Sequence, residues 1–251
     1  SGNYKFSYDE KKYADGKIHV IETLTNKEAG VISHEWHEMF ISPDDAMIML
    51  YSDGGGDYAG LTFYKLPEGT FFAWRHIMSA KFLRQKNLWI FQYELGCEVV
   101  DATDWTSLAE LEGSPSDSGY GGIDTRPICS YSGKYVAVGK NIYETSSWTK
   151  VCEVKKINYY SAFTRDDRHI LVPEEDGVHC YSIFDASEKF ILNHEKADRY
   201  DTIDVFVASN GRIITCNRKL GNVKIWDGNT GAQISFFEVK FFMNFSRFIL
   251  I

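Results

Sequence analysis

The residues best suited to chemistry in this 251-residue chain are histidines and carboxylates in two short stretches. His34-Glu35-Trp36-His37-Glu38 places two histidines three residues apart, and Asp53-Gly54-Gly55-Gly56-Asp57 places two carboxylates around three glycines. A zinc site of the H-E-x-x-H type needs its histidines four residues apart on a helix, together with a third ligand. A calcium loop needs many oxygen ligands, and glycines supply no side-chain oxygens. Neither stretch therefore predicts a metal site.

Phosphate binding and nucleophilic catalysis also lack their usual patterns. Neither a helix start nor G-K-[ST] follows the glycines at 54–56, so no phosphate cradle is predicted. Ser, His and Asp are all present, but no G-x-S-x-G places a serine on a nucleophile turn. We expect no catalytic residue and no cofactor, and hence a protein that is not an enzyme.

Composition limits the class of protein and of partner. The chain is 44% hydrophobic and 15% aromatic with only 5 prolines, which fits a strand-rich globular protein with a sizeable core. Its formal charge of -8 repels phosphate backbones and anionic lipid, so we expect neither a nucleic acid nor a membrane as partner. No run approaches roughly 18 apolar residues, the length that a membrane span needs.

The cysteines and the N-terminus indicate the compartment. The 5 cysteines are an odd number without a C-x-x-C pair, and four lie in apolar, strand-like runs. This pattern is typical of buried, reduced thiols. The first residues lack the basic start and apolar stretch of a signal peptide. We expect a cytoplasmic protein, with the nucleus as the alternative.

A repeat organises the elements that would position any site. Residues 221–237, GNVKIWDGNTGAQISFF, predict two short strands around a tight turn, and the same outline recurs five times upstream. A second half-repeat consists of an apolar run, a polar turn and another apolar run, and it occurs seven times. Its turn-leading residues are spaced 34 to 46 apart: Ser7, Ser42, Arg84, Ser130, Thr164, Ala208 and Asn244.

This period predicts the fold class. Four short strands in each repeat of about 40 to 45 residues indicate an all-β protein, a β-propeller of four-stranded antiparallel blades with six or seven blades. We expect residues 1–251 to form a single propeller domain. The last repeat is incomplete at 240–251, which leaves two interpretations open: closure of the ring on the N-terminal strands, or a fragment of a longer chain.

The run VKIWD followed by N-T-G resembles the third strand and Trp-Asp pair of a WD-repeat blade, best matched at Trp226-Asp227. Turns such as SPDD and SNGR are similar to the inner hairpins of that family. The equivalent pair is expected at Glu22-Thr23, Lys65-Leu66, Glu144-Thr145 and Ile183-Phe184. No Gly-His pair opens any repeat, and this departure weighs against the buried Asp-His-Ser/Thr-Trp network of the family.

The resemblance implies an interaction platform, and four long connections suggest where it binds: 33–38, 53–60, 113–124 and 193–202. In a propeller these connections emerge on one face, and loops on a rigid scaffold commonly bind partners. Aromatic anchors among acidic neighbours suit a basic or mixed-charge protein or peptide. The candidate partner-binding residues are Trp36, Asp57, Tyr58, Tyr120, Asp198, Arg199 and Tyr200.

The expected function is thus a non-catalytic protein–protein interaction platform, acting as a scaffold or sensor within a larger signalling or assembly protein. Two alternatives stay open, a propeller enzyme and a receptor that binds a small ligand or a modified peptide in the central channel.

Overall fold

The computed structural model describes most of the chain. The described residues are 3–8, 17–33, 38–42, 45–53, 59–75, 77, 79–93, 96–113, 126–155, 157–158, 160–195, 203–217 and 219–238. They hold 23 β-strands and one 3-10 helix, η2 (Arg84–Lys86), and no helix among them is long and apolar enough to cross a membrane. The chain divides into two compact units. The first unit consists of Ser1–Glu94 and Glu98–Leu108, and the second consists of Leu95–Cys97 and Ala109–Ile251.

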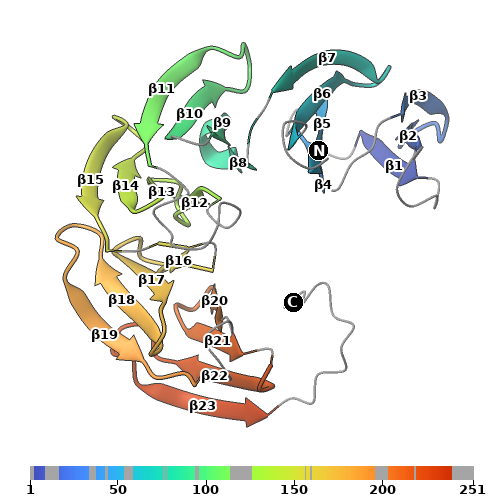
Figure 1. The fold of residues 1–251 in the computed structure, drawn as a ribbon. Helices are drawn as coiled ribbons and strands as arrows, with labels where there is room; N and C mark the ends of the chain where they lie inside the picture. The colour runs from blue at the N-terminus through green and yellow to red at the C-terminus, as the bar shows by residue number, and fades with distance from the viewer. Residues whose placement is uncertain are drawn as a thin grey trace. The chain divides into compact units, whose positions relative to one another are not determined.

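The first unit holds two sheets whose strands follow in chain order (Figure 1). The first sheet has three described strands, β1 (Tyr4–Tyr8), β2 (Lys17–Glu22) and β3 (Glu28–Ser33). The second has four, β4 (Glu38–Ile41), β5 (Met47–Asp53), β6 (Ala59–Lys65) and β7 (Thr70–Arg75). The third sheet, β8 (Ser79–Leu83), β9 (Leu88–Gln92), β10 (Gly96–Asp101) and β11 (Ser107–Glu112), contains the boundary between the units.

The second unit adds three four-stranded sheets. The fourth consists of β12 (Ile128–Cys129), β13 (Tyr135–Val138), β14 (Asn141–Glu144) and β15 (Thr149–Glu153). The fifth consists of β16 (Ala162–Phe163), β17 (His169–Pro173), β18 (Val178–Ser182) and β19 (Glu188–Leu192). The sixth consists of β20 (Ile203–Val207), β21 (Ile213–Asn217), β22 (Asn222–Trp226) and β23 (Gln233–Glu238). Four-stranded antiparallel repeats, predicted from the period, are thereby confirmed.

The inner hairpins depend on one left-handed residue. In the second, fourth, fifth and sixth sheets the fourth turn residue donates its N–H to the carbonyl of Ser42, Ser130, Thr164 or Ala208. That fourth residue has a positive φ of 55° to 80°, a conformation that Gly, Asn and Asp tolerate best. The residues at this position are Asp45, Gly133, Asp167 and Gly211, and Asn87 has the same conformation in the third sheet.

Of the seven predicted turn-leading residues, these four are confirmed and Ser7 is wrong. Arg84 begins η2, the connection between β8 and β9, and Asn244 lies outside the described residues. Ser7 lies within β1 and pairs with His19 of β2 instead of opening a turn. The sequence predicts an inner hairpin over KFSYDEKKYA, residues 5–14, because the polar centre of this stretch resembles a turn. The backbone of its first half instead continues as a strand, since Phe6 pairs with Val20 and packs at the edge of a buried cluster.

The outer hairpins share a five-residue turn in all six sheets. The fifth residue donates its N–H to the carbonyl of the first and has a φ of 52° to 71°. The first residues are Glu22, Lys65, Asp101, Glu144, Ser182 and Asp227. The fifth residues are Asn26, Gly69, Trp105, Trp148, Ala186 and Gly231.

This alignment corrects the predicted equivalents of Trp226-Asp227. The four predicted pairs are displaced by one residue, or by two in the fifth sheet, because the sequence offers no fixed marker for the turn. The structural equivalents are Ile21-Glu22, Tyr64-Lys65, Val100-Asp101, Tyr143-Glu144 and Tyr181-Ser182. Tyrosine thus occupies the tryptophan position in three sheets, which makes the WD-like pattern more regular than the sequence alone suggested.

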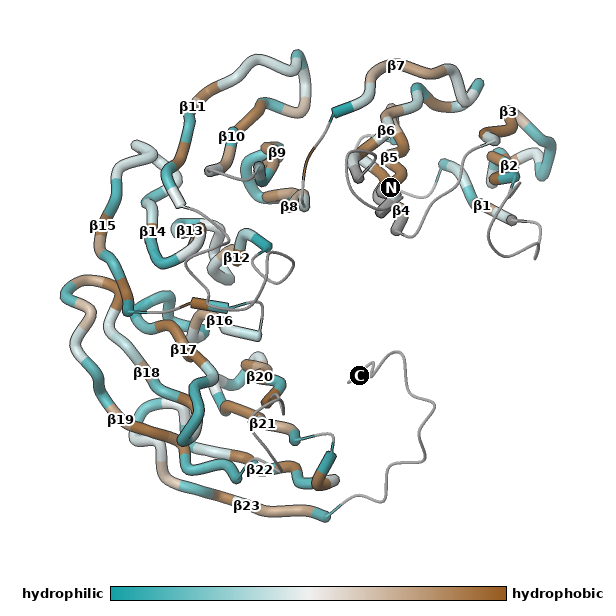
Figure 2. The backbone as a smooth tube through the Cα atoms, in the orientation of Figure 1, coloured by the Kyte–Doolittle hydropathy of each residue, from teal (hydrophilic) through white to brown (hydrophobic). Residues whose placement is uncertain are grey.

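Apolar side chains fill the space between successive sheets within each unit. Ile18, Val20 and Ile32 of the first sheet form one cluster with Ile48, Leu50 and Tyr64 of the second. Further clusters join the second sheet to the third, the fourth to the fifth, and the fifth to the sixth. Figure 2 shows the hydrophobic residues along inner strands such as β17 and β21. A sheet that is apolar on both faces is stable only when neighbours cover both.

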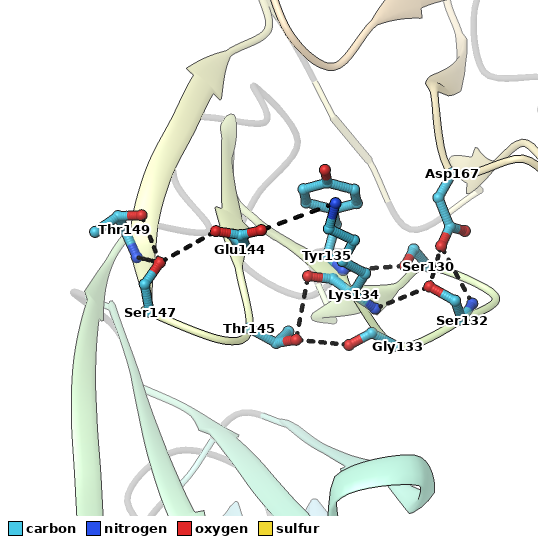
Figure 3. A network of polar contacts seen from close by, with 10 residues as sticks. All are labelled: Ser130, Ser132, Gly133, Lys134, Tyr135, Glu144, Thr145, Ser147, Thr149 and Asp167. Atoms are coloured by element: carbon cyan, nitrogen blue, oxygen red, sulfur yellow. Dashed lines mark hydrogen bonds and ion pairs between the residues drawn. The ribbon is translucent and has the colours of Figure 1, made fainter.

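Polar contacts fasten neighbouring turns as well (Figure 3). The Asp167 carboxylate of the fifth sheet accepts hydrogen bonds from the backbone N–H groups of Tyr131 and Ser132, at 3.0 and 3.3 Å, and from the Ser132 hydroxyl. Within the fourth sheet, Thr145 Oγ1 donates to the carbonyl of Gly133 at 2.7 Å. The inner turn of one sheet is thus held by the next sheet and by its own outer hairpin.

Candidate interaction surface

The seven side chains predicted to bind a partner lie outside the described residues: Trp36, Asp57, Tyr58, Tyr120, Asp198, Arg199 and Tyr200. Their involvement stays a prediction. The residues that flank their loops are described, however, and they show how the loops are attached to the sheets.

The loop that begins after Glu112 is fastened by two side chains of the fourth sheet. The Glu112 carbonyl accepts hydrogen bonds from Asn141 Nδ2 at 2.9 Å and from the Tyr143 hydroxyl at 2.7 Å. Burial raises the pKa of Tyr143, so its hydroxyl stays protonated and able to donate. Gly113 follows with a φ of 152°, and a Cβ there would lie 2.5 Å from the Val138 carbonyl oxygen. This loop base therefore requires glycine.

The loop that begins at Asn193 is fastened more extensively. Lys224 Nζ donates to the Asn193 carbonyl at 2.9 Å, and Asn217 Nδ2 donates to the Glu195 carbonyl at 2.8 Å. Between them, His194 Nδ1 lies 2.6 Å from Thr215 Oγ1. The sixth sheet thus holds three consecutive residues of the loop base.

His194 belongs to a buried hydrogen-bond network, although the absence of a Gly-His pair had indicated that no such network would form. Trp226 Nε1 donates to Thr215 Oγ1 at 2.8 Å, and the same oxygen contacts His194. All three residues are buried. The His, Thr and Trp members of the Asp-His-Ser/Thr-Trp arrangement are therefore linked at the sixth sheet, and the expectation is corrected for these three members. Asn193-His194 stands in place of Gly-His, so a search for that dipeptide could not find it.

One strand position supplies two of these attachments, those made by Asn141 and Lys224. The residue three places before the outer turn is polar in every sheet, and it is buried or half-buried in each. Where its partner is described, it bonds a nearby backbone or charged group: Glu98, for example, accepts from Arg75 Nη1 at 2.9 Å at the end of β7. The six residues at this position are His19, Thr62, Glu98, Asn141, His179 and Lys224.

His179 makes the strongest electrostatic arrangement at this position. Its Nδ1 lies 2.7 Å from Glu188 Oε2 and its Nε2 lies 2.7 Å from Asp176 Oδ1, while 9% of its side chain is exposed. Burial acts to lower the pKa of His179, but hydrogen bonds to Glu188 and Asp176 raise it, and the net pKa lies above its ordinary value. Only the imidazolium can donate to a carboxylate from both nitrogens at once, so this arrangement favours the cation and suits His179 to a structural role better than to proton transfer.

An exposed aromatic feature lies on β7, the outer strand of the second sheet. Phe71 is 63% exposed, Phe72 40% and Trp74 47%. Phe72 occupies a bulge opposite Phe63 and Tyr64, which brings consecutive aromatics to the surface. Among the other outer strands, β3, β11 and β19 expose one large aliphatic residue each, Val31, Leu108 and Ile191, whereas β23 exposes three apolar residues, Ile234, Phe236 and Phe237. We call Phe71, Phe72 and Trp74 the β7 strip.

Neighbouring side chains hold the β7 strip in place. The Phe71 ring meets the Tyr64 ring edge to face at 6.1 Å, and the Phe72 ring lies 5.8 Å from the Trp105 ring. Lys65 Nζ lies 5.0 Å from the centre of the Phe72 ring. Rings that are packed on one side and exposed on the other lose little conformational freedom on binding.

The sequence did not identify the β7 strip. The residues TFFAW lie in one of the predicted outer-hairpin repeats, and the sequence assigns them no role in binding. Its signal was the pair Phe71-Phe72, because two adjacent aromatics cannot both point to one face of a regular strand.

Metal chemistry has no support in the described ranges, where no group of three or more His, Cys, Asp or Glu side chains is placed to hold a metal ion. The buried thiols of Cys97 and Cys180 are also poorly suited to act as nucleophiles. Burial raises the pKa of both, for Cys180 to about 12.

Neither a family model nor a curated protein sequence matches the chain. Solved structures do match it. The Cps50 (Swd1) β-propeller domain of Myceliophteria thermophila is similar with a TM-score of 0.53 and 13% identity, over 94% of this chain and 83% of that one. Hsv2 of Kluyvelomyces marxianus is similar with a TM-score of 0.56 and 10% identity, over 95% of this chain and 84% of that one.

Proposed function

We propose that this chain, which folds as a WD-repeat-like β-propeller, is a non-catalytic platform that binds a protein or peptide partner. The observation that carries the proposal is the β7 strip, three exposed aromatics on an outer strand. Aromatic side chains contribute much of the binding energy at protein interfaces.

The outer position of β7 adds backbone to the recognition surface. β7 is the last strand of its sheet, in the order β4-β5-β6-β7. An edge strand offers N–H and C=O groups to an incoming extended segment, and side chains beside it provide specificity. The partner that fits is an extended segment with apolar side chains that pack on Phe71 and Trp74.

The charge of the partner follows from the charge of this chain. A net charge of -8 favours a basic or mixed-charge partner and accelerates its association at low salt. The loop residues Trp36, Tyr58, Tyr120 and Tyr200 would provide a second contact region with their acidic neighbours. We further propose that the chain works as a subunit or domain of a larger assembly in the cytoplasm or nucleus.

The β7 strip is tested by affinity capture with the intact chain. Replacing Phe71 and Trp74 by serine removes two exposed rings and leaves the buried cluster of the second and third sheets intact. We expect captured partners to fall at least about tenfold, because loss of two interface aromatics costs several kcal/mol. Partners that remain bound at full yield would contradict the assignment of this strand.

A matched variant controls for loss of surface apolarity alone. Ile234 and Phe236 on the outer strand β23 are 46% and 44% exposed, close to Trp74 at 47%. Their replacement by serine should leave capture unchanged, and both variants should unfold at the denaturant concentration of the parent. A separate variant with Trp36, Tyr58, Tyr120 and Tyr200 changed to alanine tests the loops. If this variant no longer captures the partner while the β7 variant still does, the binding site lies on the loops and not on β7.

A further inference from the structure

The inner turn of the fourth sheet binds a carboxylate that the next sheet supplies. Asp167 Oδ1 accepts from the N–H of Tyr131 at 3.0 Å, and its Oδ2 accepts from the N–H of Ser132 at 3.3 Å (Figure 3). The Ser132 hydroxyl donates to the same Oδ2. Asp45 of the second sheet likewise accepts at 3.1 Å from the N–H of Asn3, just before β1. An aspartate at the fourth position of an inner turn thus binds the sheet that precedes it.

The inner turn of the fifth sheet holds no such group in the part of the chain that the structure describes. Arg165 and Asp166 are the second and third residues of this turn, and neither backbone N–H has an acceptor among the described residues. The sixth sheet has Gly211 at the position of Asp167. A Cβ built on Gly211 would have no heavy atom within 4 Å, so the space that an aspartate would enter is open. The fourth, fifth and sixth sheets all belong to the second unit.

One difference between the two turns decides which group fits the open space. The third turn residue is Ser132 in the fourth sheet and Asp166 in the fifth. Ser132 Oγ accepts from the N–H of Lys134 at 3.2 Å, and Asp166 Oδ1 accepts from the N–H of Arg168 at 3.1 Å. Asp166 Oδ1 therefore takes the place of the Ser132 hydroxyl, the group that donates to the bound carboxylate. Lys134 and Arg168 are both cations, so they do not distinguish the two turns.

The side chain of Asp166 offers only acceptors. Burial acts to raise the pKa of Asp166, but hydrogen bonds from Thr164 Oγ1 and the Arg168 N–H lower it, and the net pKa lies below its ordinary value. A carboxylate bound at this turn would therefore lie against a second carboxylate and be repelled. A neutral group with both an acceptor and a donor avoids this repulsion. The side-chain carboxamide of Asn or Gln is such a group, and it has the shape of a carboxylate.

We propose that the inner turn of the fifth sheet, beside Gly211, binds the side-chain carboxamide of an asparagine or glutamine from a protein partner. The carboxamide oxygen accepts from the N–H of Arg165, and its NH₂ group donates to Asp166 Oδ1. Tyr131 is 58% exposed beside this turn, with the Arg165 guanidinium over its ring, and offers an aromatic contact to the same partner. This site belongs to the second unit and the β7 strip to the first, so the inference goes beyond the proposed function and does not depend on it.

The site can be filled from within the chain. Gly211→Asn places a carboxamide at the position of Asp167, and Gly211→Asp places a carboxylate of the same shape there. Asn and Asp both tolerate the positive φ of 80° at this residue. We expect the Asn variant to unfold at the higher temperature and to slow hydrogen exchange of the Arg165 amide. In the Asp166→Ser background, which restores a hydroxyl to the turn, the Asp variant should gain relative to the Asn variant. An Asn–Asp difference that is unchanged between the two backgrounds would overturn the proposal.

Small probes test binding directly on the intact parent chain. Acetamide should shift the backbone amide NMR signals of Arg165 and Asp166 in a concentration-dependent way, whereas acetate at equal ionic strength should not. The amides of Tyr131 and Ser132 are the matched control, because Asp167 already binds them and their signals should stay fixed.

The variants then link these shifts to the open space. Gly211→Asn should abolish the acetamide shift, because its own carboxamide fills the site. Acetamide that leaves the Arg165 signal unchanged, or acetate that shifts it equally, contradicts the proposal. Should the Gly211 variants fail to fold, the parent chain and Asp166→Ser decide alone. The Asp166→Ser variant should prefer acetate to acetamide, and an unchanged preference refutes the proposal. None of these measurements involves β7, so their outcome is separate from that of the partner-capture experiment.

Discussion

The side chain of Asn141 donates a hydrogen bond of 2.9 Å to the backbone carbonyl of Glu112, a residue 29 positions earlier at the end of the preceding sheet. Lys224 of the sixth sheet likewise donates a hydrogen bond from Nζ to the backbone carbonyl of Asn193, which follows the fifth sheet. Both residues occupy the polar position three places before the outer turn. The third strands of these sheets, β14 and β22, thus fix the bases of long loops, and the loops can vary without losing their attachment.

Asn141 should therefore matter for both stability and loop order. Asn141 is 6% exposed, and its replacement by Asp would place a carboxylate against the Glu112 carbonyl. We expect unfolding to become easier by about 1–3 kcal/mol, the usual cost of a buried polar group that loses its hydrogen bond. Denaturant unfolding measures the loss, and hydrogen exchange at 112–113 should accelerate. Thr149→Ala, at an exposed position of the neighbouring strand, should change neither quantity.

The Thr215 hydroxyl should stabilise the sixth sheet through both of its partners. Thr215→Val keeps the shape but removes the oxygen that contacts His194 and accepts from Trp226. We expect a loss of about 1–3 kcal/mol, because buried polar groups on two side chains lose their partner. Trp226→Phe should cost less in the Thr215→Val background than in the parent. Additive effects in this double-mutant cycle would show that Thr215 and Trp226 do not act together.

The ion triad of Asp176, His179 and Glu188 predicts a pH dependence. The pKa of His179 is raised in the folded protein, so its contribution to stability is complete below the pKa of the unfolded chain, about 6.5, and disappears as pH rises through the folded value. The unfolding free energy of the parent, compared with His179→Gln, should therefore fall from about pH 6.5 upward. At acid pH, the hydrogen bond to His179 lowers the pKa of Asp176 in the folded protein. The contribution of Asp176 to stability therefore disappears as pH falls through this lowered pKa. A difference between parent and variant that is constant with pH would refute the triad.

The left-handed fifth residue of the outer turns makes a paired prediction. Ala186 has a φ of 52° and Gly231 a φ of 70° at equivalent positions. Ala186→Gly should change the free energy of unfolding by between zero and about 1 kcal/mol in the stabilising direction, since a non-glycine residue is strained there. Gly231→Ala should destabilise it, because the added Cβ would lie 2.6 Å from the Phe190 ring as well. Thermal unfolding of both variants gives the signs, and equal signs would contradict the turn assignment.

The repeat and its turns were accessible from sequence because they are local. Alternation of apolar residues and polar turn residues at a regular period does not depend on distant contacts, so the four-stranded sheets and the turns led by Ser42, Ser130, Thr164 and Ala208 were predicted correctly. Ser7 was misplaced because a short polar stretch within a strand looks like a turn until its partner strand is known.

The candidate site was less accessible. The seven loop residues remain predictions, whereas the β7 strip was missed because exposure is a property of the packed sheet and cannot be read from TFFAW alone.

The sequence by itself determined the class of the protein, through a period of strands and turns that each residue's own conformational preferences enforce. The tertiary structure alone decided which polar residues are linked. His194 reaches Thr215 across 21 positions, and Asn141 reaches Glu112 across 29. Such pairs carry no local signal, because their hydrogen bonds gain strength only where neighbouring sheets exclude water from them.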